Sequence, residues 1–225
     1  MPQEMKMIDV GGVNCFLLKT GDGRFALIDT GFARQRAALE QELLSSGCQP
    51  GNLKLILLTH GDADHAGNAA YLRERFKAKI ALHPGDAGMV ERGDMNWQRK
   101  PKPDYVAFPF RVILFLFGRQ SELDLFKADV SLQDGQDLAD YGLDLRVLHL
   151  PGHSQGSVGF LTSTGDLYCG DLVWNIGKPG FHFIDDMQAA RASVRKLPEL
   201  GVKTVYPGHG KPFPVEKLSR VISIR

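Results

Sequence analysis

The chain has 225 residues, 43% hydrophobic and 24% charged, which is enough apolar material for one packed core and argues against a mainly disordered protein. Lysine and arginine total 27 against 26 aspartate and glutamate residues, so the formal net charge is +1. This balance gives no electrostatic basis for binding nucleic acid, an anionic membrane or a polyanionic partner, and it favours a small-molecule substrate.

The cysteines and the N-terminal residues indicate the compartment. The three cysteines are odd in number and lack C-x-x-C spacing, so the sequence predicts neither a disulfide framework nor a zinc knuckle. The first residues lack a basic start followed by an apolar stretch, and the most apolar run, 112–117, is far shorter than the ~20 residues that a membrane helix needs. We therefore expect a cytoplasmic protein without a membrane span.

The first part of the chain predicts a β-hairpin, a helix and a buried strand. Apolar runs at 14–19 and 24–28 flank a Gly-Asp-Gly turn, a pattern typical of a hairpin. Apolar positions recur at helical spacing over 33–44 and stop before Ser-Ser-Gly, which predicts a helix. The apolar run 54–59 is typical of a buried strand whose carboxyl end opens on a functional site.

The remaining elements alternate between strands and helices. Helices are predicted at 67–76 and 186–197, and strands at 79–82, 143–150, 157–162, 166–169 and 203–206. Two strand-rich halves, each followed by helices, predict an α/β protein with an αββα sandwich, in which two mixed β-sheets pack face to face and helices lie outside. We expect residues 1–225 to form a single domain.

Residues 86–129 differ in amino-acid composition from the rest of the chain and are interpreted as an insertion. Several prolines precede a bulky apolar run that includes Phe115 and Phe117, more than a surface loop should expose. A helical lid that shapes an apolar substrate pocket, a homodimer contact and ordinary core packing all remain open. In the first case Phe115 and Phe117 would contact substrate.

Histidine and aspartate residues gather where predicted strands end. The run H-G-D-A-D-H at 60–65 places four ionisable side chains within six residues, and His153, Asp171 and His209 each follow a later strand. The small residues within the run let the loop curl so that its polar side chains converge, and imidazole and carboxylate ligands suit zinc, iron or manganese. The alternative is a polar loop that caps the next helix.

These motifs resemble those of the metallo-β-lactamase superfamily, from about residue 13 to residue 214. The stretch 59–65 matches the family signature T-H-x-H-x-D-H except at Asp62, where the family has a second histidine. The P-G-H-S sequence at 151–154, the G-D pair at 170–171 and the P-G-H-G sequence at 207–210 resemble the later family motifs. Together they imply the fold and a metal-dependent hydrolase.

The resemblance also implies a site for two divalent transition-metal ions. Zinc is the usual family metal, but a carboxylate at Asp62 favours a harder ion and brings in iron or manganese. The implied ligands are His60, Asp62 and His153 for one ion, Asp64, His65 and His209 for the other, and Asp171 bridging the two.

Such an ion pair would lower the pKa of a bridging water and polarise the scissile carbonyl or phosphoryl group, so no serine or cysteine nucleophile is required. Asp64 would act as a ligand and as an acid/base partner late in the reaction. Asp29 either orients a ligand histidine from behind or is a turn carboxylate. His182 either contacts substrate or packs at the surface, and His83 and His149 are expected to be structural.

We expect hydrolysis of a small ester, thioester or lactone. Three alternatives remain: a phosphodiesterase or nuclease, against which the neutral charge argues; an iron-dependent oxygen-using enzyme, which Asp62 favours; and a non-enzymatic metal-binding sensor. Few residues follow Gly210, so the C-terminal glutathione-binding helices of glyoxalase II-like enzymes are not expected, and a glutathione thioesterase of that type is disfavoured.

Overall fold

The computed structural model describes residues 4–108 and 123–223, and the N-terminal half of this part forms a mixed β-sheet. Its strands, in spatial order, are β1 (Met5–Asp9), β2 (Asn14–Lys19), β3 (Phe25–Ile28), β4 (Leu53–Leu57), β5 (Lys79–Leu82) and β7 (Val130–Ser131). β1, β2 and β3 pair antiparallel, which confirms the predicted hairpin, and β3, β4, β5 and β7 pair parallel.

The C-terminal half forms a second mixed sheet. Its strands, in spatial order, are β15 (Phe213–Pro214), β14 (Thr204–Pro207), β10 (Asp166–Gly170), β9 (Val158–Leu161) and β8 (Arg146–His149). β10 and β14 are parallel, and the other neighbours are antiparallel. Two short antiparallel pairs form separate two-stranded sheets: β11 (Trp174–Ile176) with β12 (Lys178–Gly180), and β13 (Phe183–Ile184) with β6 (Tyr105–Val106).

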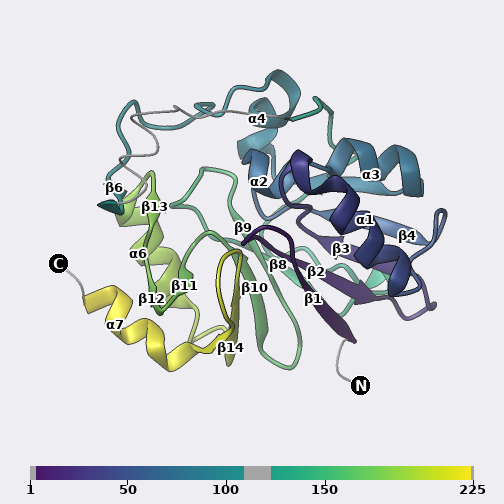
Figure 1. Cartoon of the computed structure of the whole chain (residues 1–225). Coiled ribbons are helices and arrows are strands. Elements are labelled where there is room, and N and C mark those ends of the chain that lie inside the picture. Colours follow the sequence, from purple (N-terminus) through teal and green to yellow (C-terminus); the bar gives the residue numbers. More distant parts are fainter. Residues whose placement is uncertain (1–3, 109–122, 224–225) are drawn as a thin grey trace.

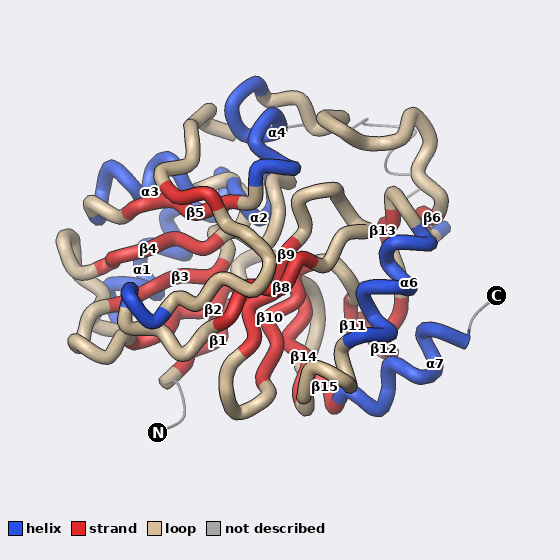
Figure 2. The backbone as a smooth tube through the Cα atoms, turned by 180° about the vertical axis from the view of Figure 1, so that it is seen from behind, coloured by secondary structure: helices blue, strands red, loops and turns tan. Residues whose placement is uncertain are grey.

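Helices cover the outer faces of both sheets, as Figures 1 and 2 show. The α-helices are α1 (Arg36–Ser45), α2 (Ala63–Ala66), α3 (Ala69–Phe76), α4 (Ala87–Arg92), α6 (Met187–Lys196) and α7 (Leu218–Ser223), and short 3-10 turns occupy Ala33–Gln35, Pro84–Asp86, Ala139–Tyr141 and Val215–Lys217. α1 and α3 pack on the first sheet, and α6 and α7 on the second. The predicted αββα sandwich is therefore confirmed.

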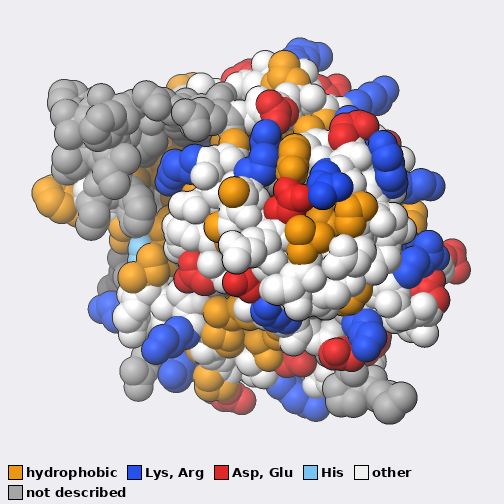
Figure 3. All heavy atoms as spheres, turned by 45° about the vertical axis from the view of Figure 1, so that its right-hand side comes forward, with side chains coloured by type: hydrophobic (Ala, Val, Ile, Leu, Met, Phe, Trp, Pro, Cys, Tyr) orange, Lys and Arg blue, Asp and Glu red, His pale blue; other side chains and the backbone are white. Residues whose placement is uncertain are grey.

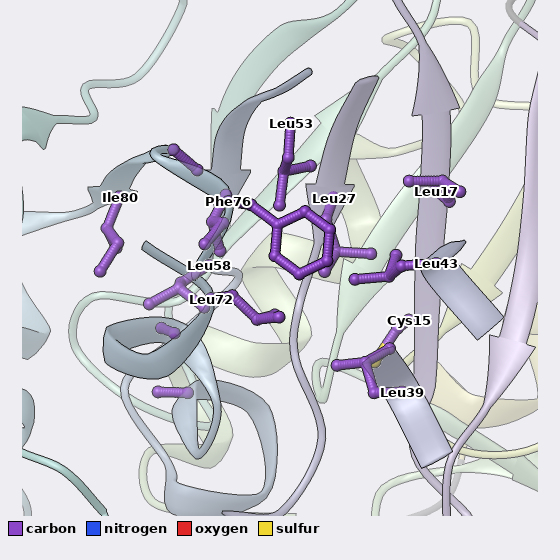
Figure 4. Close-up of a cluster of buried hydrophobic side chains, with 14 of the residues drawn as sticks. Cys15, Leu17, Leu27, Leu39, Leu43, Leu53, Leu58, Leu72, Phe76 and Ile80 are labelled. Atoms are coloured by element: carbon purple, nitrogen blue, oxygen red, sulfur yellow. The ribbon is translucent and has the colours of Figure 1, made fainter. Parts of the chain in front are cut away.

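The alternation of side chains along each strand explains the four layers. In β2, Cys15 and Leu17 face the cluster under α1 and α3, whereas Phe16 and Leu18 face the cluster between the sheets. Apolar residues at both sets of positions therefore bury both faces of the strand. Figure 4 shows the outer cluster, in which Phe76 and the leucines of the helices meet the strand side chains.

The helix predicted at 67–76 begins differently in the structure. Residues 63–66 already form the helical turn α2, and the chain breaks at Gly67 before α3 starts. A Cβ at Gly67 would lie 2.6 Å from the backbone nitrogen of Ala33, and Asn68 Nδ2 donates to the carbonyl oxygens of Thr30 (2.7 Å) and Phe32 (2.9 Å). The break is thus caused by close contact with the loop that follows β3.

The described part of the insertion 86–129 runs from α4 along one edge of the sandwich to β6, which pairs with β13 (Figures 1 and 2). Met89 and Val90 are fully buried, so its start belongs to the core, whereas Phe108 is 76% exposed. Phe115 and Phe117 lie outside the described residues. Within residues 4–108 and 123–223, no helix is both long and apolar enough to cross a bilayer. Acidic and basic side chains are interspersed over the face in Figure 3.

Candidate metal centre

The two sheets bring their carboxyl-terminal strand ends to a common edge, and the predicted ligands lie there. The run 60–65 starts soon after β4 of the first sheet, and Asp171 and His209 follow the parallel strands β10 and β14 of the second. His153 follows β8 in the loop before β9. Since side chains at the carboxyl ends of parallel strands point into the same crevice, residues far apart in sequence meet here.

Asp171 lies at the middle of this group. Its carboxylate oxygens are 3.2 Å from His65 Nε2, 3.5 Å from His209 Nε2, and 4.0 Å from both His60 Nε2 and His153 Nε2. All five side chains are buried. One carboxylate is therefore shared by four imidazoles that come from both halves of the chain.

The two other carboxylates divide the histidines into pairs. Asp64 Oδ2 lies 3.5 Å from His209 Nε2 and 3.8 Å from His65 Nε2. Asp62 Oδ2 lies 2.8 Å from His153 Nε2 and 3.6 Å from His60 Nε2. We call Asp64, His65 and His209 the Asp64 half of the centre, and His60, Asp62 and His153 the Asp62 half.

The other ring nitrogen of each histidine is fixed by a hydrogen bond. His153 Nδ1 lies 2.7 Å from the carbonyl oxygen of Phe183, and His209 Nδ1 lies 2.7 Å from that of Gly12. Because a carbonyl oxygen only accepts, both Nδ1 atoms donate. The Nε2 atoms that face Asp171 are then the ones available to bind a cation.

Asp29 fixes the remaining two rings. Its carboxylate accepts hydrogen bonds from the Thr59 backbone N–H, from Thr59 Oγ1 and from His65 Nδ1, each at 2.8 Å. Thr59 Oγ1, which donates to Asp29, accepts from His60 Nδ1 at 2.9 Å. The network therefore orients both His60 and His65 with Nε2 towards Asp171, and Asp29 lies behind the group rather than within it.

The grouped side chains have polar atoms that other protein groups leave unsatisfied, and divalent cations could bind these atoms. Within the described residues, His60 Nε2 and Asp171 Oδ1 are buried and have no hydrogen-bond partner, a costly arrangement unless a ligand satisfies them. Gly208 leaves room beside them, because a Cβ there would collide with Asp171 Oδ1 and lie 2.7 Å from His65 Cε1. Ligating atoms of Asp64, His65, Asp171 and His209 all lie within 4.8 Å of one another, as do those of His60, His153 and Asp171, and of His60, Asp62 and Asp64.

The pKa shifts of the histidines differ between the halves. Burial, together with the neighbouring His65 and His153, holds the pKa of His60 well below its usual value, so its ring is neutral. Burial also opposes the charging of His209, but Asp171 and Asp64 outweigh it and raise the pKa of His209 to about 10. The pKa of His65 is raised for the same reason, chiefly by Asp171 and Asp29 against the effect of burial. The Asp64 half therefore attracts positive charge strongly.

Arg99, a residue that sequence reasoning missed, contacts the ligand that departs from the family pattern. Its Nη2 donates to Asp62 Oδ2 at 2.8 Å, and its side chain is only 2% exposed. Burial alone would raise the pKa of Asp62, but Arg99 and His153 outweigh it and hold that pKa well below its usual range. Asp62 occupies the N-cap position of α2 but makes no capping hydrogen bond, so helix capping does not explain it.

Asp86, at the start of the insertion, was also missed. It is fully buried and accepts hydrogen bonds from Gly61 N (3.0 Å), Ser154 Oγ (2.7 Å) and Gly156 N (2.8 Å). It thereby joins the loop that carries His60 and Asp62 to the loop that carries His153. Neither residue has a motif around it, so only the fold reveals that the insertion supports the centre.

The remaining histidines differ in their distance from the centre: His182 lies beside it, whereas His83 and His149 do not contact it. His182 stacks on Trp174 with ring centroids 5.0 Å apart, and Trp174 lies 4.1 Å from the ring of His209. His83 and His149 stack on each other at 4.4 Å and belong to none of the metal-binding groups found among the described residues. The three cysteines are free and buried, and burial raises the pKa of Cys169 to about 12, so it supplies no thiolate near neutral pH.

Comparisons with known proteins agree with this geometry. The family model described as the metallo-beta-lactamase superfamily matches residues 8–209. The chain is 29% identical to the hydroxyacylglutathione hydrolase GloC of Haemophilus influenzae (88% of this chain, 85% of that protein) and 29% identical to the acyl-coenzyme A thioesterase MBLAC2 of Bos taurus (88% and 68%). It is 28% identical to an atrochrysone carboxyl ACP thioesterase of Aspergillus fumigatus, of which it spans about half (51%).

Solved structures of metallo-beta-lactamase-like proteins share the fold of this chain. The protein TTHA1623, crystallised in a di-iron-bound form, is 26% identical, with 98% of each chain covered and a TM-score of 0.66. A metallo-beta-lactamase family protein from Thermus thermophilus is 24% identical, with 97% of this chain and 78% of that chain covered and a TM-score of 0.70, and it supports the fold.

Proposed function

This chain belongs to the metallo-beta-lactamase superfamily and is a metallo-hydrolase, and we propose that it cleaves thioesters formed between a small acyl group and a thiol carrier. The observation that carries the proposal is the convergence of four imidazole Nε2 atoms on the carboxylate of Asp171. The names of the three relatives above, all thioester hydrolases, support the substrate class. Although the sequence alone disfavours a glutathione thioesterase of the glyoxalase II type, the similarity to a hydroxyacylglutathione hydrolase makes glutathione thioesters candidate substrates, together with thioesters of coenzyme A and acyl carrier protein.

We propose that two divalent transition-metal ions bind at this group. The donors fit them because each Nδ1 is already hydrogen-bonded and because His60 Nε2 and Asp171 Oδ1 lack other partners in the described structure. The proposed ligands are His60, Asp62 and His153 on one side, Asp64, His65 and His209 on the other, and Asp171 between them. When bound, the ions would supply an ionised water near neutral pH and a Lewis acid for the thioester carbonyl.

The protein's own groups position the water and handle its protons. Asp64 is 22% exposed and therefore reaches the open side of the centre, unlike Asp171, whose side chain is 3% exposed. Attack of water on the thioester forms the acid and expels a thiolate, and the proton lost by the water passes through Asp64 to that thiolate. Burial raises the pKa of all three cysteine thiols, to about 12 for Cys48 and Cys169, so none of them supplies a thiolate nucleophile near neutral pH.

A second candidate, an iron-dependent oxygen-using enzyme, draws support from one neighbour. TTHA1623 was crystallised in a di-iron-bound form, and a carboxylate such as Asp62 favours iron or manganese over zinc. Elemental analysis of protein purified with limiting zinc, iron and manganese identifies the preferred metal. Oxygen consumption by the iron-loaded protein with a persulfide or thiol substrate, without thiol release from thioesters, would favour this candidate.

The test of the hydrolase proposal is a panel of thioesters of glutathione, coenzyme A and pantetheine, with a lactone and a phosphodiester for comparison. Released thiol is measured with a chromogenic disulfide. We expect turnover of at least one thioester and a loss of more than about 100-fold in His60→Ala and Asp171→Ala. His149→Ala is the matched control, because His149 stacks on His83 away from the centre, and it should keep full activity. A metal-loaded protein that turns over only the phosphodiester refutes the proposal.

A further inference from the structure

The two halves of the centre contain the same kinds of ligand but differ in the charge behind them. Each half has one aspartate and two histidines, and both share Asp171. Behind the Asp64 half stands the carboxylate of Asp29, hydrogen-bonded to His65. Behind the Asp62 half stands the guanidinium of Arg99, which pairs with Asp62 itself. Other buried carboxylates, Asp86 and Asp185, also face Arg99. The charged group that directly contacts a ligand is therefore negative in the Asp64 half and positive in the Asp62 half.

Arg99 is held in place by its surroundings. Its backbone N–H donates to the carbonyl oxygen of Asn96 at 3.0 Å, and the next backbone N–H, of Lys100, donates to Asp185 Oδ1 at 3.0 Å. Asp185 is itself buried. With a side chain only 2% exposed, the guanidinium is shielded from solvent, so water screens its charge little.

The contact falls on the ligand atom that a cation would need. Asp62 Oδ2 accepts from Arg99 Nη2 at 2.8 Å, and the same oxygen is the one near His153 Nε2 (2.8 Å) and His60 Nε2 (3.6 Å). A cation that binds through this oxygen must share it with the guanidinium or displace the guanidinium. A protonated histidine can release its proton to make way for a metal, but an arginine keeps its charge at every relevant pH.

We propose that Arg99 makes the centre bind its two ions in a fixed order, with the first in the Asp64 half and the second, more weakly, in the Asp62 half. The inference rests on the proposed function, since it assumes that the centre binds divalent ions. The expected gap between the two dissociation constants is about 100-fold. A buried unit charge in contact with a ligand should weaken the binding of a divalent ion about as much as the loss of a supporting hydrogen bond does. Arg99 is thus a positioning and charge-setting residue supplied by the insertion.

The test is a titration of the metal-free full chain with Zn²⁺ against a competing chromogenic chelator, repeated with Co²⁺ to follow its visible spectrum. We expect two binding phases in the wild type. Asp64→Asn should remove the tight phase and Asp62→Asn the weak phase. Arg99→Met should tighten the weak phase at least tenfold, whereas Arg99→Lys, which keeps the charge, should leave a wide gap.

The matched control is Arg75→Met, which removes a surface arginine of α3 that is paired with the carboxylate of Glu40 at 2.9 Å instead of with a ligand of the centre. It should leave both phases unchanged. Two ions of equal affinity in the wild type, or a tight phase that depends on Asp62 rather than Asp64, overturns the inference even if Arg99→Met does not fold. A folded Arg99→Met with an unchanged gap overturns it too. A wild-type chain that binds no ion at all would instead overturn the proposed function.

Discussion

The Asp64 half and the Asp62 half of the centre are supported by different parts of the molecule. Asp29, which orients His65, directly follows β3, and Gly12, which accepts from His209 Nδ1, lies in the loop between β1 and β2. In contrast, the Asp62 half depends on Asp86 and Arg99, both from the insertion. The Asp64 half is therefore supported by the sandwich, whereas the Asp62 half draws on the insertion in addition to Thr59 and Phe183, which orient His60 and His153. A change to either support should affect the two halves unequally, which gives a way to test the comparison.

The largest effect should come from the residue that both halves share. Asp171→Ala removes a buried carboxylate within 4.0 Å of all four imidazoles, so we expect both ions to bind more than about 100-fold more weakly and thioester hydrolysis to fall to background. Chelator-competition titration and the thiol-release assay measure these effects. A variant that retains one tight ion would show that Asp171 serves a single half.

A smaller and one-sided effect is expected from Asp29→Asn. The amide keeps the shape of the side chain, but its NH₂ group cannot accept, so at least one of the donors from Thr59 and His65 loses its partner. We expect ion binding in the Asp64 half to weaken by about 10- to 100-fold, because Asp29 contacts His65 directly. The Asp62 half should change less, because Asp29 acts on His60 only through Thr59. Equal weakening of both phases of the metal titration would mean that Asp29 acts through the fold as a whole.

The counterpart on the other side is Asp86→Asn. This change disturbs hydrogen bonds from Gly61, Ser154 and Gly156 in a fully buried position, so roughly 2–4 kcal/mol of folding stability should be lost. Ion binding in the Asp62 half should weaken by about tenfold while the Asp64 half is spared. Urea denaturation gives the stability, and the titration separates the halves. If the tight phase weakens instead, the assignment of Asp86 to the Asp62 half is wrong.

The two halves also differ in what the sequence could predict. The ligands of both follow strand ends in recognisable motifs, so the sequence predicts that they lie together. For Asp29 the sequence leaves two roles open, a carboxylate that orients a ligand histidine and a turn carboxylate, and its hydrogen bond to His65 supports the first. Asp86 and Arg99 are ordinary charged residues in a segment of unusual composition, and their role depends on how the insertion folds back on the sandwich. The sequence did not predict β1, because an edge strand with mostly exposed residues lacks a strong apolar pattern. It did not predict the helix break at Gly67 either, because that break is set by contact with a loop distant in sequence and leaves no local signal. The role of the insertion as a lid or as a dimer contact stays a prediction.

The smallest effect on the metal-loaded protein should be a pH dependence of stability, because this dependence is confined to the metal-free chain. The pKa of His209 is raised to about 10 in the folded chain, above the value near 6.5 expected after unfolding, so its proton stabilises the fold. That contribution is fully present below about pH 6.5 and is lost as the pH rises towards 10. The free energy of unfolding of the metal-free chain should therefore decline over this window, and His209→Gln should flatten the decline. In the metal-loaded protein a cation replaces the proton on Nε2, so the same urea titrations should show little slope, and a slope that persists with metal bound would place His209 outside the ligand set.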